Sequence, residues 1–204
     1  MTEMPGERKM HDNRAGSYLC PYCLARLDTF QSLKAHVVTA HSTEPLPLPE
    51  GVIRLTINGE NFLIHVEPEW TLYYLLHDLL GLTGTKLMCD QGACGSCTVI
   101  LDGRPVLSCM TLAIECHDKV IETIEGVAAE GHPLIDAYVE QHAMQCGYCT
   151  PGFILTARAL LEHNVDPTEE EIKEALAGNL CRCGTYPQHP KAVHKAARVL
   201  LGGS

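Results

Sequence analysis

The sequence predicts an α+β fold in which a small mixed sheet with one helix precedes a four-helix bundle, and a short cysteine- and histidine-containing module precedes both. Three observations lead to this prediction. Apolar and polar residues alternate after Gly51, helical spacing replaces the alternation after Gly131, and three prolines interrupt the chain just before Gly51. The predicted bounds are 1–44 for the module, which has a flexible start, 45–50 for the linker, 51–127 for the sheet domain and 128–204 for the helical domain.

Two hairpins supply most of the predicted sheet. Residues 53–57 alternate between apolar and polar side chains, Asn58-Gly59 provides the positive φ of a tight turn, and residues 62–66 form the return strand. Asp102-Gly103 marks the turn of a second hairpin. That hairpin and a closing strand are expected over residues 98–101, 104–107 and 120–123.

Helices are expected where apolar residues recur at three- and four-residue spacing. One lies in the sheet domain over residues 72–80, with five leucines facing inward and Gly81 at its end. Four more follow Gly131; three open with a proline, and Thr168 begins a capping box with Glu171. Their predicted spans are 133–144, 151–163, 168–177 and 190–201. The brief loops between them indicate a bundle.

Composition disfavours several functions. No apolar run approaches the roughly 18 residues that a membrane-crossing helix needs. The first residues contain no apolar signal segment, so we expect a cytoplasmic protein. The net charge of -10 disfavours binding to nucleic acid or to an anionic membrane, because phosphate contacts depend on clustered Lys and Arg. Protein partners are expected instead.

The 11 cysteines point to metal centres rather than to disulfides, because the cytosol keeps thiols reduced. All except Cys116 fall in tight groups, and the ligands of one metal centre must converge in this way. Cys116 is expected to be a buried thiol without a metal.

The first large group has the spacing of plant-type [2Fe-2S] ligation. Cys89-x4-Cys94-x2-Cys97 is followed by Cys109, and the C-x4-C spacing is awkward for a zinc knuckle. Two bridged irons need four thiolates around a flat rhomb, so the loop must wrap closely. Glycines at positions 92 and 95 suit that wrap, because they permit positive φ and a close backbone approach.

The second group is less decisive from spacing alone. Cys146-x2-Cys149 and Cys181-x-Cys183 could hold a second iron-sulfur cluster or the zinc of a ribbon. The single residue between Cys181 and Cys183 argues against zinc. Both pairs lie beside predicted helix ends, as though a cluster were held at the head of the bundle.

Three segments together resemble the small iron-sulfur subunit of molybdenum hydroxylases, the xanthine dehydrogenase and aldehyde oxidoreductase family. They are GTKLMCDQGACGSCTV at residues 84–99, QCGYCTPG at 145–152 and GNLCRCG at 178–184. The resemblance covers about residues 52–200, with all eight ligand positions filled. Met88 departs from it, because the family often has glycine there.

The resemblance implies a β-grasp ferredoxin-like domain followed by a four-helix domain, each with one [2Fe-2S] cluster. It also implies a large partner subunit with molybdopterin and, usually, a medium subunit with FAD. Electrons would pass singly from molybdopterin to the cluster at Cys146, Cys149, Cys181 and Cys183, then to the cluster at Cys89, Cys94, Cys97 and Cys109, and on to the acceptor. Gln145 and Cys183 occupy positions that contact the pterin in this family.

The N-terminal module must be interpreted separately. Cys20-x2-Cys23 followed by His36-x4-His41 resembles a C2H2 zinc finger, in which two thiolates and two imidazoles complete a closed tetrahedral site. A redox dithiol would need a βαβ scaffold, and too few residues precede Cys20 for one. Disorder is the remaining alternative.

We expect this finger to serve docking or assembly rather than DNA recognition. The positions that would read bases are Thr29, Ser32 and Ala35, and none of these is arginine, lysine, asparagine or glutamine. Arg26 and Lys34 alone supply little charge for phosphate contacts.

The sequence therefore predicts the electron-transfer subunit of a cytoplasmic molybdenum hydroxylase with an added zinc finger. No catalytic nucleophile or general base is evident, so bond-making belongs to the partner. The alternative is a stand-alone ferredoxin-like carrier, or a redox-sensing regulator that uses its finger to bind a partner or DNA. Substrate and acceptor are not encoded in this chain.

Overall fold

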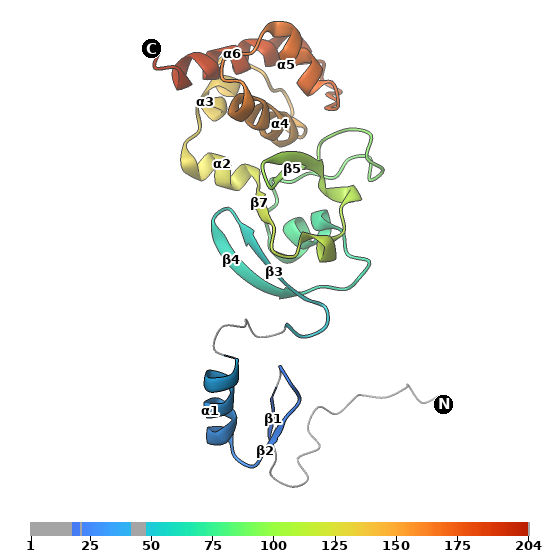
Figure 1. The fold of residues 1–204 in the computed structure, drawn as a ribbon. Coiled ribbons are helices and arrows are strands. Elements are labelled where there is room, and N and C mark those ends of the chain that lie inside the picture. The colour runs from blue at the N-terminus through green and yellow to red at the C-terminus, as the bar shows by residue number, and fades with distance from the viewer. Residues whose placement is uncertain (1–17, 21, 42–47, 204) are drawn as a thin grey trace, which may run out of the picture. The chain divides into compact units, whose positions relative to one another are not determined.

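The computed structural model describes residues 18–20, 22–41 and 48–203. The chain forms two compact units, Met1–Pro49 and Glu50–Ser204 (Figure 1). Half of the predicted linker, residues 45–47, and the predicted flexible start lie outside the described residues. Within the described part of the chain, no helix is both long enough and apolar enough to cross a membrane.

The N-terminal unit is a small hairpin with one helix. Strands β1 (Tyr18–Leu19) and β2 (Arg26–Leu27) pair antiparallel, and α1 spans Phe30–Ala40. Thr29 caps the helix, because its hydroxyl accepts from the Ser32 N–H while the Ser32 side chain accepts from the Thr29 N–H.

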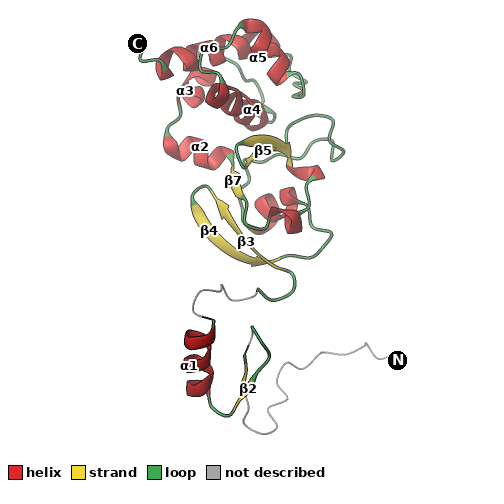
Figure 2. Ribbon diagram, in the orientation of Figure 1, coloured by secondary structure: helices red, strands yellow, loops and turns green. Residues whose placement is uncertain are grey.

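The second unit begins with a five-stranded mixed sheet, in the order β4-β3-β7-β5-β6 (Figure 2). Two hairpins pair antiparallel and β7 pairs parallel to β3, which confirms the predicted mixed sheet. Asn58 and Asp102 adopt the positive φ that the two turns require. The strands are β3 (Val52–Ile57), β4 (Glu60–His65), β5 (Thr98–Leu101), β6 (Arg104–Leu107) and β7 (Val120–Glu122).

The helix of the sheet domain differs from the prediction. It has π-type hydrogen bonding over η1 (Tyr74–Leu79), and the Leu80 N–H donates to the Leu75 carbonyl. Leu72, Leu75 and Leu76 are buried against the sheet as expected, but Leu79 is 45% exposed. The prediction was wrong for Leu79, because the wider turn carries it off the face that 3.6-residue spacing assigns to it.

Five α-helices follow the sheet, one more than predicted. The additional helix is α2 (Ile124–Glu130), which ends at Gly131 in the left-handed region. The predicted helix over 133–144 stops at Glu140, since His142 takes a positive φ. The other helices are α3 (Pro133–Glu140), α4 (Thr150–His163), α5 (Glu169–Leu176) and α6 (His189–Leu200).

Helix α4 joins the sheet and the helices into one unit. It contacts β5 and every other α-helix of the unit, and Phe153 and Leu155 on it are buried in the helical core. The division at residue 127 between a sheet domain and a helical domain stays a prediction, because the chain from Glu50 onward packs as one compact unit.

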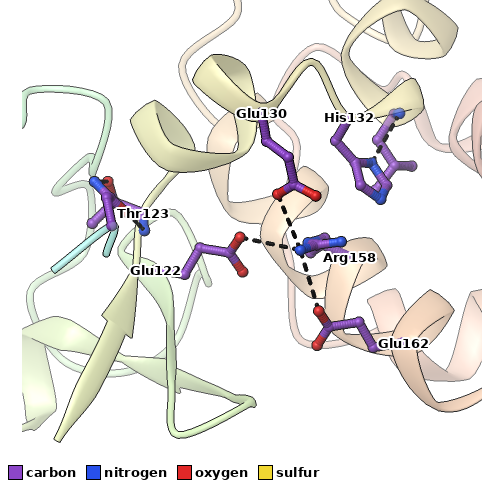
Figure 3. Close-up of polar contacts among 8 residues, drawn as sticks. Glu122, Thr123, Glu130, His132, Arg158 and Glu162 are labelled. Carbon is purple, nitrogen blue, oxygen red and sulfur yellow. Dashed lines mark hydrogen bonds and ion pairs between the residues drawn. The ribbon is translucent and has the colours of Figure 1, made fainter. Parts of the chain in front are cut away.

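A charged cluster reinforces the same junction. Arg158 on α4 contacts the carboxylates of Glu122, Glu130 and Glu162 at 3.3, 3.2 and 3.3 Å (Figure 3). The Arg158 side chain is only 16% exposed, so these ion pairs are less screened than surface pairs. One guanidinium thus ties β7, α2 and α4 together.

Candidate metal centres

The structure brings together the four cysteines of the first predicted cluster, here called the loop quartet. Cys89, Cys94 and Cys97 lie on the loop between η1 and β5, and Cys109 lies in the short 3-10 helix Ser108–Met110 that follows β6. The Sγ atoms of Cys97 and Cys109 are 3.3 Å apart, and the side chains of Cys89 and Cys94 are in contact. Two close sulfur pairs result.

Glycines let the loop close around this quartet. Gly92 and Gly95 have φ of 74° and 73°. A Cβ on Gly95 would lie 2.7 Å from the Gly178 carbonyl oxygen and 2.6 Å from Asn179 Nδ2. Gly95 is therefore required both by its φ and by a distant segment that packs on it.

Backbone N–H groups of the loop favour the thiolate form of Cys89, the half-buried member of the loop quartet. The N–H groups of Gln91 and Ala93 point at Cys89 and lower the pKa of that thiol to about 7. Burial, in contrast, raises the pKa of Cys109 to about 11. A buried thiol loses its proton when a metal binds, because the positive metal ion stabilises the thiolate; a raised pKa is therefore compatible with a ligand role.

The other four cysteines, here called the bundle quartet, come from two separate loops. Cys146 and Cys149 lie before α4, whereas Cys181 and Cys183 lie between α5 and α6. The Sγ atoms of Cys146 and Cys183 are 3.5 Å apart, and the side chains of Cys149 and Cys181 are in contact. The structure thus gathers all four predicted ligands through helix packing.

Polar groups around the bundle quartet are aimed at Cys181. Its Sγ lies 3.2 Å from Thr185 Oγ1, which in turn lies 3.2 Å from His189 Nε2, and its N–H donates to the Tyr186 hydroxyl at 2.8 Å. Burial raises the pKa of Cys181, but hydrogen bonds from Thr185, together with those from Cys149 and Cys183, outweigh it and the pKa falls to about 7. Burial, together with the neighbouring Cys181, raises the pKa of Cys149 to about 12.

Two buried hydroxyls test whether iron-sulfur clusters fit. Ser96 Oγ and Thr150 Oγ1 are buried and lack a hydrogen-bond partner within the described residues. Ser96 precedes Cys97 and Thr150 follows Cys149, so each lies beside a predicted ligand. Such groups are donors for the sulfur atoms of a cluster. With the positive-φ glycines and paired sulfurs, both sites fit [2Fe-2S] clusters.

The two quartets lie directly against each other. The Leu180 N–H donates to the Cys94 carbonyl at 2.9 Å, and Asn179 Nδ2 donates to the Gly95 carbonyl at 3.1 Å. Asn179 Oδ1 accepts from the Thr156 hydroxyl on α4. A Cβ on Gly152 would lie 2.3 Å from the Gly95 carbonyl oxygen, so the backbones are in contact there.

The quartets differ in their exposure. Each quartet has one half-buried cysteine, Cys89 or Cys183, but the other three of the loop quartet are buried, whereas the bundle quartet has two buried cysteines and an exposed one, Cys146. Gln145 is also exposed. The two residues predicted to contact the pterin thus both keep some solvent exposure, and one of them, Cys183, lies beside Cys146.

The structure also brings the N-terminal ligands together. The ligand atoms of Cys20, Cys23, His36 and His41 all lie within 4.8 Å of one another.

Cys116, in contrast, is buried apart from the quartets, and burial raises the pKa of its thiol to about 11.

Sequence reasoning missed several residues that support the centres. No spacing rule predicts the roles of Asn179, Thr185 and Tyr186, because these roles depend on which segments pack together. Within the segment 178–184, spacing pointed only to Cys181 and Cys183, and Asn179 was included only because the whole segment resembles the family.

Comparison with known proteins identifies the family. Residues 55–119 match the family described as "2Fe-2S iron-sulfur cluster binding domain", and residues 123–194 match the "[2Fe-2S] binding domain" family. The nicotinate dehydrogenase small FeS subunit of Eubacterium barkeri is 49% identical over 151 residues, which cover 73% of this chain and 94% of the relative. The nicotine 6-hydroxylase small subunit of Paenarthrobacter nicotinovorans is 43% identical, covering 74% and 92%.

Solved structures agree with this assignment. The chain matches quinoline 2-oxidoreductase from Pseudomonas putida 86 with a TM-score of 0.71 and 42% identity, covering 74% of this chain and 96% of that one. Aldehyde oxidoreductase from Desulfovibrio gigas also gives a TM-score of 0.71 at 41% identity, where the match covers 74% of this chain and 17% of the larger one. The chain belongs to the family of small [2Fe-2S] iron-sulfur subunits of molybdenum hydroxylases.

Proposed function

We propose that the loop quartet and the bundle quartet each hold one [2Fe-2S] cluster, so that this chain carries single electrons between two partner subunits. The observation that carries the proposal is the gathering of eight sulfurs into two quartets, each made of two close pairs, on loops that touch. Within a quartet each close pair would bind one iron: Cys89 with Cys94, Cys97 with Cys109, Cys146 with Cys183, and Cys149 with Cys181. When bound, such clusters supply one-electron redox chemistry.

The protein residues would set the properties of these sites. Cysteine sulfur would accept hydrogen bonds from the amide N–H groups of Gln91 and Ala93 and from the Thr185 hydroxyl. Such donors stabilise the reduced cluster, which carries more negative charge, and each further donor increases this stabilisation. Burial of Cys94, Cys97 and Cys109 would exclude water from the loop quartet. The contacts of Asn179 and Leu180 would hold the two sites at a fixed separation.

The exposure of the bundle quartet supports a direction for electron flow. Cys146, Cys183 and Gln145 would face a molybdopterin-binding large subunit, and the loop quartet would pass electrons to a medium subunit with FAD or to another acceptor. Relatives named as small or beta subunits of dehydrogenases and of a hydroxylase support such an assembly rather than a stand-alone carrier or regulator.

Substrate choice would lie in the large subunit. The names of similar subunits refer to nicotinate, nicotine and caffeine, although each of these subunits is 41–49% identical to this chain. We place the complex in the cytoplasm, because a chain with 11 thiols suits a reducing compartment.

Metal analysis and spectroscopy of the anaerobically purified complex test the proposal. We expect about four iron and four acid-labile sulfide per chain, with two distinct diiron signals by EPR after reduction. Cys183→Ser should remove or alter one signal and slow substrate-driven reduction of the other centre, whereas Cys109→Ser should affect the other signal without slowing reduction of the first. Unchanged single-turnover reduction of both centres in Cys183→Ser would count against the proposed order.

A further inference from the structure

The N-terminal unit holds a second kind of metal-ligand set. Its described residues, 18–20 and 22–41, lie outside the segments that match the two iron-sulfur domain families. Within them, Cys20, Cys23, His36 and His41 converge with their ligand atoms within 4.8 Å of one another. Two sulfurs and two imidazole nitrogens from four chain positions therefore surround one point.

The elements of the unit explain how these side chains meet. Cys20 follows β1, and Cys23 lies in the turn before β2, where Leu24 takes a φ of 58°. His36 lies on α1 and His41 is the residue at which that helix ends, with φ of -132°. Leaving the helix there allows His41 to approach His36, so that their ring centroids are 5.2 Å apart.

The distances suit a four-coordinate ion. Cys23 Sγ and His36 Nε2 are 3.3 Å apart. With Zn–S of about 2.3 Å and Zn–N of about 2.0–2.1 Å, tetrahedral geometry separates a sulfur and a nitrogen by roughly 3.5 Å. The Tyr22 ring is stacked on His41 at 4.6 Å and helps to orient that imidazole.

Burial shows why the unit needs an ion. Among its described residues only Cys20 is buried, and α1 contains no buried residue. Tyr18, Leu24, Phe30 and Val38 are all exposed rather than packed into a core. A segment this short buries too little apolar surface to offset the entropy of ordering its backbone, so another source of free energy must hold it.

We propose that Cys20, Cys23, His36 and His41 form a closed structural Zn²⁺ site on which the fold of the N-terminal unit depends. Binding replaces the two thiol protons, which leave to solvent, and two neutral imidazoles complete the shell. The charges of Zn²⁺ and the two thiolates cancel, so the site has no net charge. With all four positions filled by protein ligands, the ion has no open position for catalysis.

Zinc K-edge absorption on the intact complex tests this proposal. After equilibration with a small excess of Zn²⁺ and gel filtration, we expect about one zinc per chain, with two sulfurs at about 2.3 Å and two nitrogens at about 2.0–2.1 Å. A shell of four sulfurs would place the zinc in a cysteine quartet and overturn the proposal. So would the absence of zinc while residues 18–41 stay protected from protease.

A double variant, Cys23→Ser with His36→Ala, separates this site from the iron-sulfur centres. It should lose the zinc and become sensitive to protease within residues 18–41, with iron content and both diiron EPR signals unchanged. His65→Ala, at an exposed histidine on β4, is the matched control and should keep the zinc. Retention of zinc in the double variant would overturn the proposal. Loss of iron-sulfur signals in the parent chain would contradict the proposed function and leave the zinc site standing.

Discussion

The loop quartet and the bundle quartet reach a similar arrangement of sulfurs by different routes. Three ligands of the loop quartet come from one short segment, residues 89–97, and glycine conformations shape that segment. The bundle quartet exists only when the loop before α4 meets the loop between α5 and α6. A local loop therefore defines the first site, whereas helix packing defines the second. The two should respond differently to damage in the helical core.

The largest effect is expected where the loop quartet and the start of α4 are in backbone contact. Gly152→Val should disrupt both centres, because even a Cβ at this position would lie 2.3 Å from the Gly95 carbonyl oxygen. Overpacking of this kind costs about 1–3 kcal/mol or more, and here the neighbour is backbone that cannot turn aside. Iron content and both EPR signals should fall severalfold. Gly178→Ala is the control, since a Cβ there meets nothing within 4 Å; equal losses in the two variants would contradict this account.

Damage confined to the helical core should separate the two centres. Phe153 on α4 is buried, and its ring stacks on His189 with centroids 4.0 Å apart. Phe153→Ala should cost about 3–5 kcal/mol of stability. During a denaturant titration the EPR signal of the bundle quartet should be lost before that of the loop quartet. Simultaneous loss of both signals would show that the unit fails as a whole.

A smaller effect is expected from the link between the quartets. Asn179→Ala removes the hydrogen bond to the Gly95 carbonyl and leaves the Thr156 hydroxyl without that partner. The expected cost is about 1–3 kcal/mol. Stopped-flow single-turnover reduction should show slower transfer from the bundle quartet to the loop quartet, with iron content retained. A normal transfer rate would mean that the remaining contacts, such as the hydrogen bond from the Leu180 N–H to the Cys94 carbonyl, are enough to fix the separation.

The smallest effect concerns the reduction potential of one centre. Thr185→Val removes the hydroxyl 3.2 Å from Cys181 Sγ. A donor to cysteine sulfur stabilises the reduced state, so its loss should lower the potential of the bundle quartet. One hydrogen bond is worth about 1 kcal/mol, or roughly 40 mV for one electron. EPR-monitored redox titration measures the shift, and Thr111→Val, whose hydroxyl donates to the Leu107 carbonyl, should leave this potential unchanged.

Much of the fold could be predicted because its signals are local. Alternation along β3 and the Asn58-Gly59 turn identified the first hairpin, and cysteine spacing identified the loop quartet. Helix α2 was missed because it is short and contains Gly126. Glycine is required at position 126 by a tertiary contact, since a Cβ there would lie 2.5 Å from Asn58 Oδ1.

The parts that escaped prediction depend on contacts between distant segments. Glu162 lies four residues after Arg158 on the same helix, but nothing local indicates that Glu122 and Glu130 also converge on Arg158. Asn179 likewise acts through Gly95, far away in the sequence. For the bundle quartet, spacing alone left zinc open, and the resemblance to a family decided for iron and sulfur.

The hydrogen bond between Leu180 and Cys94 constrains evolution at position 180 in an unusual way. It joins the backbone N–H of Leu180 to the backbone carbonyl of Cys94, so this path between the two ligand loops contains one hydrogen bond, and no side chain takes part in it. The Leu180 side chain is 47% exposed and can be exchanged without touching that hydrogen bond. Proline is the exception, because it has no N–H to donate. Position 180 should therefore tolerate nearly every amino acid and reject one.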